Sequence, residues 1–290
     1  MQKIIEHNKG KICLLVSAFL YGLTPIFAKI TYMGGANGIT LTFLRAAMTV
    51  PLLFVLMRSL NIEISLSKSE ISKITILSIF GGTVPIMLLY LSYDYISAGL
   101  ATTLHFIYPI VIVFVSAFIY HERLSVFKLV AVVLVTVGIF MFVRIQTRAD
   151  TIGVVLALLS GVFYSFYVIY LDKSGLDKMD YIKLTFYVML LMSASTLVFG
   201  LAINRIQFEL TQKAWIYAGI VSLIATVLAT PMFQVGVKYE GASTAGILST
   251  FEPVTATALG AVFLGELLGG YQIVGGIVIM TGLYIAQKFG

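Results

Sequence analysis

Charged residues are scarce in this chain. Asp, Glu, Lys and Arg make up 11% of its 290 residues, whereas soluble domains carry about 25%. Apolar residues make up 59%, and the mean hydropathy is +1.01. This composition excludes a water-soluble globular protein. The single cysteine, Cys13, excludes an intrachain disulfide and a cysteine-based metal site.

The motifs of common enzymes and motors are also missing. The chain has no GxxxxGK phosphate loop, no HExxH zinc motif and no GxSxG nucleophile motif. We therefore expect neither an ATP-driven motor nor an enzyme, and no cofactor. An intramembrane enzyme built on one His and one Glu, or a non-transporting subunit, stays open as an alternative. The net charge of +6 is spread thinly along an apolar chain, so we interpret it as membrane topology and not as nucleic-acid binding.

Long apolar runs account for the composition. A membrane-spanning helix needs about 20 apolar residues, and ten windows of about this length are separated by short polar breaks. We therefore predict an all-α integral membrane protein with ten transmembrane helices. The predicted spans are residues 12–31, 38–57, 74–92, 98–120, 127–143, 151–171, 181–203, 214–237, 242–264 and 271–287.

Lysine and arginine indicate the orientation of these spans. Both residues accumulate in cytoplasmic loops. With the N-terminus inside, thirteen of them fall on the inner side and five near the outer side, while Arg45 lies within a span. We expect a multi-pass protein of the cell membrane with both termini in the cytoplasm.

The two halves of the chain repeat each other. Residues that match at offsets of 143 or 144 positions include the pairs Ser17 and Ser160, Tyr21 and Tyr164, Pro109 and Pro253, Glu122 and Glu266, and Gly138 and Gly282. We predict two five-helix domains, residues 1–146 and 147–290. Because five is odd, the second copy enters the membrane from the opposite face, as in many secondary transporters, in which substrate binds between the repeats. A duplication retained only for symmetric packing is the alternative.

All six prolines fall within predicted spans. Each removes a backbone hydrogen bond, and a membrane helix tolerates this only where protein or a wet cavity satisfies the freed carbonyl. The predicted kinks lie at Pro25, Pro85, Pro109, Pro231 and Pro253. For Pro25 and Pro51 we favour a bend that serves packing. Gly81, Gly82 and Gly241 are candidate pivots, with close helix packing as the alternative.

Three ionisable residues lie deep in predicted spans. Glu252 stands about ten residues, or about 15 Å, into its span, where a carboxylate is costly. We expect it to face the bundle interior, as a proton-coupling group or a site for a substrate amine, or else to fasten helices together. His105 is expected to bond across helices or, when protonated, to bind a substrate carboxylate. Arg45 either snorkels to the outer interface or reaches the cavity as a counter-ion.

Further polar and aromatic side chains at mid-span depth are candidate substrate contacts. They are Tyr21, Thr24, Tyr90, Tyr108, Tyr164, Tyr167, Gln234 and Thr250. Membrane tyrosines also serve packing and interfacial belts, so each of them has a structural alternative. Glu122 and Glu266 precede the fifth and tenth spans, where we expect them to cap helices.

These residues resemble the EamA family of the drug/metabolite transporter superfamily over essentially the whole chain. The resemblance is carried by Phe43-Leu44-Arg45, Pro109, His121-Glu122-Arg123-Leu124 and Gly138, and by the second-half echo in Phe251-Glu252-Pro253, Gly265-Glu266-Leu267-Leu268 and Gly282. The first half has Tyr108 where the second has Glu252, so we expect an asymmetric cavity.

The resemblance implies a secondary carrier for small metabolites, often an exporter of amino acids or related compounds, that works by alternating access. We expect a central cavity lined by the first, third and fourth helices and their repeat mates. A proton is the candidate coupling ion, and two fused halves make a monomer sufficient. An exporter of drugs or lipid-like compounds is the alternative within transport.

Overall fold

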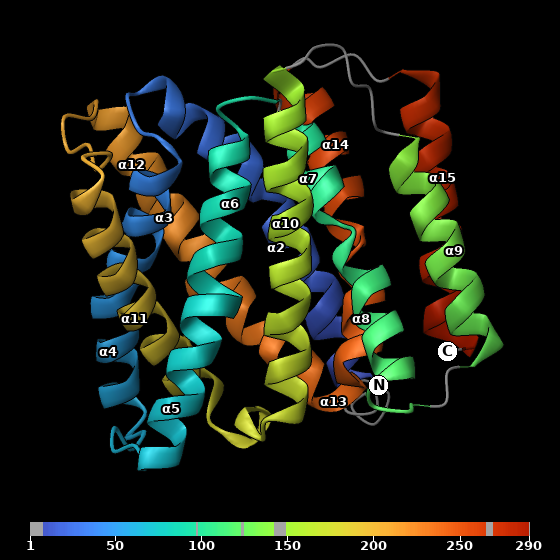
Figure 1. Ribbon diagram of the computed structural model, residues 1–290, viewed down its shortest axis with the longest axis horizontal. Helices are drawn as coiled ribbons and strands as arrows, with labels where there is room; N and C mark the ends of the chain where they lie inside the picture. The colour runs from blue at the N-terminus through green and yellow to red at the C-terminus, as the bar shows by residue number, and fades with distance from the viewer. Residues whose placement is uncertain (1–7, 97, 123–124, 142–148, 265–268, 290) are drawn as a thin grey trace.

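The computed structural model describes residues 8–96, 98–122, 125–141, 149–264 and 269–289. Throughout these ranges the regular structure is helical, and Figure 1 shows the helices side by side between two ends of one bundle. The first-half elements are α2 (Lys9–Met33), α3 (Gly38–Ala47), α4 (Thr49–Ser59), α5 (Lys68–Ile76), η1 (Leu77–Thr83), α6 (Val84–Ser92), α7 (Ala98–His105), α8 (Tyr108–Phe118) and α9 (Val126–Phe140). The second-half elements are α10 (Ala149–Lys173), η2 (Leu176–Lys178), α11 (Tyr181–Ala202), α12 (Gln212–Val221), η3 (Ser222–Ala229), α13 (Thr230–Leu248), α14 (Phe251–Leu264) and α15 (Gly270–Phe289).

Seven helical stretches in the described ranges are long and apolar enough to cross a membrane. They are Lys9–Met33, Gly38–Ser59, Lys68–Ser92, Leu100–Phe118, Thr151–Lys173, Tyr181–Ala202 and Gln212–Leu248. Val126–Phe140 and Ile273–Ala286 are shorter apolar helices. Gly241, within the last of the seven stretches, has φ 75° and ψ 169°, so this stretch is two helical segments joined without a loop. The protein is thus a multi-pass membrane protein; the number of ten spans stays a prediction.

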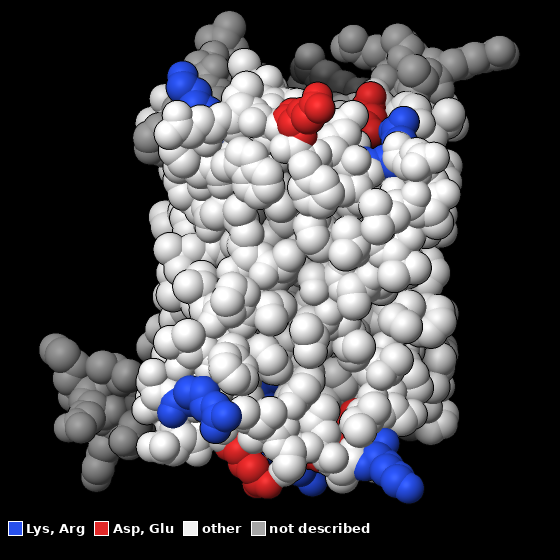
Figure 2. Space-filling view, turned by 90° about the vertical axis from the view of Figure 1, so that its left-hand side faces the viewer, with Lys and Arg blue, Asp and Glu red and all other residues white. Residues whose placement is uncertain are grey.

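Polar contacts between loops gather at the two ends of the bundle. At one end Lys73 Nζ donates to the Ser174 carbonyl (2.7 Å). At the other end Asn37 Nδ2 donates to the Arg205 carbonyl (2.7 Å), and Arg205 lies 3.9 Å from the Asp94 carboxylate. Figure 2 shows Lys, Arg, Asp and Glu at these ends with an uncharged band between them. Such a band is what the hydrocarbon core of a bilayer requires.

Two spans contain widened π-helical turns, η1 and η3. Each precedes a proline, Pro85 or Pro231, which occupies the first turn of the next helical segment. A proline lacks the N–H that would bond the carbonyl four residues earlier, so the helix is already interrupted here. The hydroxyls of Thr83 and Thr230 donate to the carbonyls five residues earlier, at 3.1 and 2.9 Å.

The other predicted kinks have different forms. Pro109 lies in the first turn of α8, after a break that separates α8 from α7, and Pro253 lies in the first turn of α14, after a break from α13. Pro25 lies inside the 25-residue helix α2, and Pro51 lies in the first turn of α4. Five of the predicted spans, residues 38–57, 74–92, 98–120, 214–237 and 242–264, are thus built from consecutive helical segments, and backbone groups in their interior are freed from regular helical bonding.

Packing places α2 in the middle of the bundle, where it contacts α12, η3, α13 and α14 of the second half. The pair α9 and α15 stands at one edge (Figure 1). A Cβ added at Gly138 would lie 2.7 Å from the Gly275 carbonyl, and one at Gly282 would lie 3.0 Å from the Ala131 carbonyl. The two repeat-related glycines therefore allow close approach of this pair.

The expected cap at Glu122 is wrong. The N-terminus of α9 is capped by Ser125, whose hydroxyl accepts the N–H of Lys128. The Glu122 carboxylate instead accepts Lys173 Nζ at 2.5 Å and Ser243 Oγ at 3.2 Å. A hydroxyl one position before the helix accepts a first-turn N–H more directly than a carboxylate four positions before it. Glu266 lies outside the described residues.

Candidate functional site

A central cavity lies between the two halves of the chain. About 760 Å³ of empty space lies between its walls, with the open solvent at its mouth included. Helices α2, α3, α6 and α7 and segment η1 line it from the first half, and α10, α11, α13 and α14 from the second. The second and seventh predicted spans therefore contribute through Arg45, Val188, Met189 and Met192, besides the helices that we expected.

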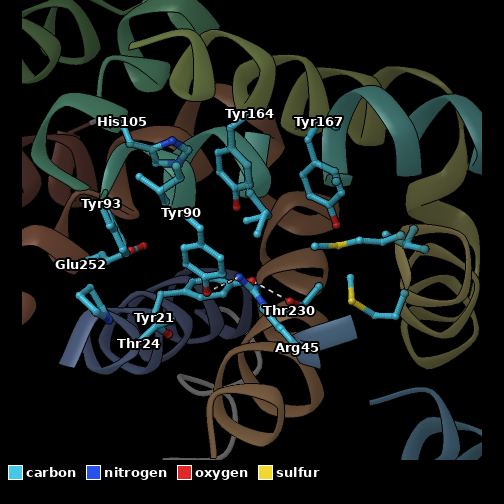
Figure 3. A pocket seen from close by; sticks show the side chains of 18 residues that line it. Tyr21, Thr24, Arg45, Tyr90, Tyr93, His105, Tyr164, Tyr167, Thr230 and Glu252 are labelled. Carbon is cyan, nitrogen blue, oxygen red and sulfur yellow. Dashed lines mark hydrogen bonds between the residues drawn. The ribbon is translucent and has the colours of Figure 1, made fainter. Parts of the chain in front are cut away.

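Eight of the eleven predicted substrate contacts line this cavity. They are Tyr21, Thr24, Arg45, Tyr90, His105, Tyr164, Tyr167 and Glu252, drawn in Figure 3. The other three lie behind its wall. The Tyr108 ring packs 5.4 Å from the His105 ring and 4.9 Å from the Tyr164 ring. Gln234 Nε2 donates to the Tyr167 hydroxyl at 3.1 Å, and the Thr250 hydroxyl donates to the Ile247 carbonyl.

Arg45 reaches inward and does not snorkel to the interface. Its side chain is 6% exposed. Nε donates to the Thr226 hydroxyl on η3 at 3.0 Å, and Nη1 donates to the Tyr90 hydroxyl at 3.5 Å. No carboxylate among the described residues forms an ion pair with it. A buried cation held only by neutral groups favours an incoming anion, which would replace its lost hydration.

Glu252 lies in the first turn of α14, directly after the break in its span. The carboxylate is half-buried, lines the cavity, and accepts no hydrogen bond from any described residue. A helix N-terminus carries partial positive charge, which favours a carboxylate at this position. Figure 3 shows Glu252 beside Tyr93 on one side of the cavity, with Arg45 on the other.

His105 ends α7, at the first-half break. Its Nδ1 lies 2.7 Å from Ser160 Oγ on α10, and Ser160 Oγ donates to the Pro85 carbonyl at 2.8 Å. The Ser160 hydroxyl on α10 is therefore bonded both to α7, through His105, and to α6, through Pro85. His105 is 5% exposed; its ring packs edge-on against Phe106 and at tilted angles of 55° and 50° against Tyr108 and Tyr164.

Two further side chains that line the cavity carry hydroxyl groups. The Thr24 hydroxyl has no hydrogen-bond partner among the residues that the structure describes, and its oxygen is sealed from the cavity. A buried unpaired hydroxyl costs about 1–3 kcal/mol. The Tyr21 hydroxyl bonds Thr230 Oγ1 at 2.8 Å. Since Thr230 donates its hydrogen to Ala225, Tyr21 is the donor in this bond.

A hydrogen-bonded partition separates the central cavity from a smaller one of about 220 Å³. Tyr167 lines the larger cavity, Gln234 lines the smaller one, and the two side chains are bonded to each other. Gln234 Oε1 also accepts the Thr185 hydroxyl at 3.2 Å. The smaller cavity is lined further by Asp177 and Lys238, next to the end of the bundle that holds Lys173.

Several cavity residues were not predicted from the sequence. Tyr93 and Thr230 line the cavity, and Thr226 and Ser160 position Arg45 and His105. Tyr93 follows Tyr90 at helical spacing, and Ser160 repeats Ser17, so both had a signal. Thr226 had none, because its partner is 181 residues away. In the described ranges no group of three His, Cys, Asp or Glu is arranged to hold a metal ion.

A multi-pass helical bundle built around a central cavity with a few polar and charged side chains is the architecture of many membrane transporters. A family model described as the EamA-like transporter family matches residues 8–144 and 151–287. The chain belongs to the EamA-like transporter family.

Similar proteins agree with this assignment. An uncharacterized transporter of Archaeoglobus fulgidus is 29% identical over 58% of this chain and 59% of that protein. The uncharacterized transporter YcbK of Bacillus subtilis (strain 168) is 25% identical over 94% of this chain and 91% of that protein. A solved crystal structure superposes with a TM-score of 0.81 at 15% identity, covering 96% of both chains, and so shares the fold. The protein is a membrane transporter.

Proposed function

We propose that this transporter is a secondary carrier for small zwitterionic metabolites, amino acids or related compounds, which it exports across the cell membrane by alternating access. The observation that carries the proposal is the pairing of an unneutralised Arg45 with an unneutralised Glu252 in one cavity. A guanidinium suits a substrate carboxylate, and a carboxylate suits a substrate ammonium group.

The directions of the first helices of the two proposed halves support an inverted repeat, which we propose as the basis of the mechanism. α2 begins close to Glu240, because a Cβ added at Gly10 would contact the Glu240 side chain. The C-terminal end of α2, at Gly34, lies against Thr211. α10 runs the other way: its start, at Gly153, packs on Ile96, and its end, at Lys173, meets Glu122. Corresponding first helices of the halves 1–146 and 147–290 thus point in opposite directions. Symmetry of this kind supplies equivalent inward-open and outward-open states.

Counterflow into sealed liposomes tests the proposal. Vesicles that contain the purified protein are loaded with a concentrated amino-acid mixture and offered each labelled amino acid outside. Saturable, protein-dependent uptake of the unchanged compound is expected. No uptake by folded protein would contradict the amino-acid assignment, and a chemically altered product would indicate an enzyme.

An exporter of drug-like or lipid-like compounds is the second candidate. Tyrosines and the thioethers of Met189 and Met192 line much of the cavity, and methionine adapts to varied apolar ligands. Uptake of labelled apolar amines, unaffected by amino acids, would favour this candidate.

A proton is the proposed coupling ion, with Glu252 as its carrier. The Glu252→Gln variant is expected to lose proton-driven transport while it keeps substrate exchange, because an amide cannot release the proton. Glu209→Gln, a change in an exposed loop, is the matched control. Unchanged pH dependence of transport in Glu252→Gln would contradict this role.

Both termini are proposed to be cytoplasmic, as the excess of Lys and Arg at that end of the bundle indicates. In a Cys13→Ala background, Glu209→Cys is expected to react with a membrane-impermeant thiol reagent on intact cells. Lys288→Cys is expected to react only after the cells are permeabilised. The reverse pattern would overturn the orientation.

A further inference from the structure

The hydrogen bonds around His105 determine which ring nitrogen carries the hydrogen. A carbonyl oxygen only accepts, so the 2.8 Å contact between Ser160 Oγ and the Pro85 carbonyl uses the single hydroxyl hydrogen of Ser160. The Ser160 oxygen therefore acts as acceptor in its 2.7 Å contact with His105 Nδ1. Nδ1 must donate this bond, and it carries a hydrogen.

The other ring nitrogen, Nε2, has no such partner. No hydrogen bond or ion pair from a described residue reaches it, and His105 lines the central cavity. The buried side-chain atoms left unpaired in the described ranges are hydroxyls of Thr24, Ser116 and Thr196, so Nε2 is not sealed within the protein. With the ring neutral and Nδ1 protonated, Nε2 presents a lone pair.

We propose that His105 is a specificity-determining residue whose Nε2 lone pair accepts a hydrogen bond from an ammonium or hydroxyl group of the substrate, with Ser160 as the residue that fixes this tautomer. The inference rests on the proposed carrier function and deepens it. It reverses the expectation that a protonated His105 binds a substrate carboxylate.

The arrangement of charges gives the substrate a direction. Figure 3 shows His105 and Glu252 on one side of the cavity and the guanidinium of Arg45 beyond the tyrosines. The first side offers acceptors, a lone pair and a carboxylate, whereas Arg45 offers only donors. A zwitterion therefore places its ammonium group toward His105 and Glu252 and its carboxylate toward Arg45. A carboxylate placed against Nε2 would face a lone pair and be repelled.

Nitrogen-15 NMR of the histidine rings measures the tautomer directly. The chain has three histidines, His7, His105 and His121, so protein labelled only at histidine gives few signals, and the His105→Asn variant assigns one set. We expect a protonated Nδ1 and a bare Nε2 for His105 in substrate-free liposomes at neutral pH. A bare Nδ1 with protonated Nε2, or a doubly protonated ring, would overturn the proposal.

Two serine variants separate the positioning role from general packing. Ser160→Ala removes the acceptor of Nδ1–H, and the His105 signals are expected to change to a mixture of tautomers. Ser116→Ala removes a buried hydroxyl of α8 that has no partner among the described residues, and the signals are expected to stay unchanged. Equal changes of the His105 signals in Ser160→Ala and Ser116→Ala would contradict the role of Ser160.

Three probes of one carbon skeleton test the ligand contact: leucine, 3-methylbutylamine, which lacks the carboxylate, and 4-methylpentanoate, which lacks the amine. Leucine and the amine are expected to shift the Nε2 signal of His105, and the acid is not. A shift with the acid alone would overturn the assignment. No shift with any probe, together with the expected tautomer, would contradict the amino-acid substrate of the proposed function and leave the tautomer established.

Transport kinetics give an independent readout. His105→Asn keeps an amide donor near the Nδ1 position, for Ser160, but has no acceptor at the Nε2 position. Its KM for amino-acid counterflow is expected to rise at least about tenfold with little change in maximal rate, the effect of losing one hydrogen bond to a charged group. His105→Gln extends an amide oxygen toward the Nε2 position and is expected to recover part of this loss. Equal KM values for wild type and His105→Asn would contradict the contact.

Discussion

The contact between α7 and α10 at Gly161 makes a stability prediction that the structure quantifies. A Cβ added there would lie 2.3 Å from the His105 carbonyl oxygen and 2.6 Å from Ile107 Cγ2, and real Cβ contacts essentially never fall below 3.0 Å. The carbonyl belongs to the backbone, so Gly161→Ala must push the two helices apart by several tenths of an ångström. Overpacking of this kind costs about 1–3 kcal/mol, and the better helix propensity of alanine returns at most about 1 kcal/mol.

With the full return of helix propensity subtracted, the predicted net effect is a destabilisation of up to about 2 kcal/mol, seen as a lower melting temperature in detergent. Because Gly161 adjoins Ser160, the transport rate of Gly161→Ala is also expected to fall. Gly219→Ala is the matched control, since nothing lies within 4 Å of a Cβ added at this glycine on α12. We expect that control to keep or slightly raise the melting temperature. Equal melting temperatures and transport rates for the two variants would refute the close approach of α7 and α10.

Two further predictions concern ionic groups. Partial burial alone would raise the pKa of Glu122, but the hydrogen bond and charge of Lys173 outweigh it and lower this pKa below its ordinary value of 4.5. The stabilisation by the ionised Glu122 is therefore complete above the ordinary pKa and is lost as pH falls through the lowered pKa. The melting temperature of wild type should exceed that of Glu122→Gln at neutral pH, and the two melting temperatures should converge in acid. A difference in melting temperature that persists in acid would contradict the ion pair. Arg45→Lys keeps the charge but loses the planar fork that reaches both Thr226 and Tyr90. The KM of Arg45→Lys should rise about tenfold. The control Arg58→Lys, in the last turn of α4, should transport like wild type. Equal KM values in the two variants would contradict the hydrogen bonding of Arg45.

Sequence patterns predicted the parts of this fold that depend on local chemistry. Apolar runs located the spans, and the matching positions of Pro109 and Pro253 located the two breaks. The depth of Glu252 in an apolar segment predicted that it faces the interior, because exposure to lipid is costly. The position of Arg45 left two alternatives, a side chain that snorkels to the interface or one that reaches the cavity. That reasoning needs only one helix at a time.

The rest depended on which helices meet. Thr226 bonds Arg45 and Ser160 bonds His105 only because the fold brings distant spans together. Tyr108 and Gln234 lie at mid-span depth as expected, yet the rotation of their helices turns them behind the cavity wall. Ser125 caps α9, and Glu122 instead forms an ion pair with Lys173, a residue of the other half.

The π-helical turns η1 and η3 have a consequence for how this chain tolerates changes in length. A π turn holds one residue more than the α turn that it replaces, so removing one residue within Leu77–Thr83 leaves enough chain for a continuous α-helix. Every later residue of that span would then keep its position around the helix, so Tyr90 would still face Arg45. In a continuous α-helix the same deletion displaces the later residues by one position, which corresponds to a rotation of about 100°. A single-residue deletion within Leu77–Thr83 should therefore leave a folded protein that keeps its substrate preference, whereas a deletion in the uninterrupted helix α11 should turn the later residues of that helix away from their packing partners.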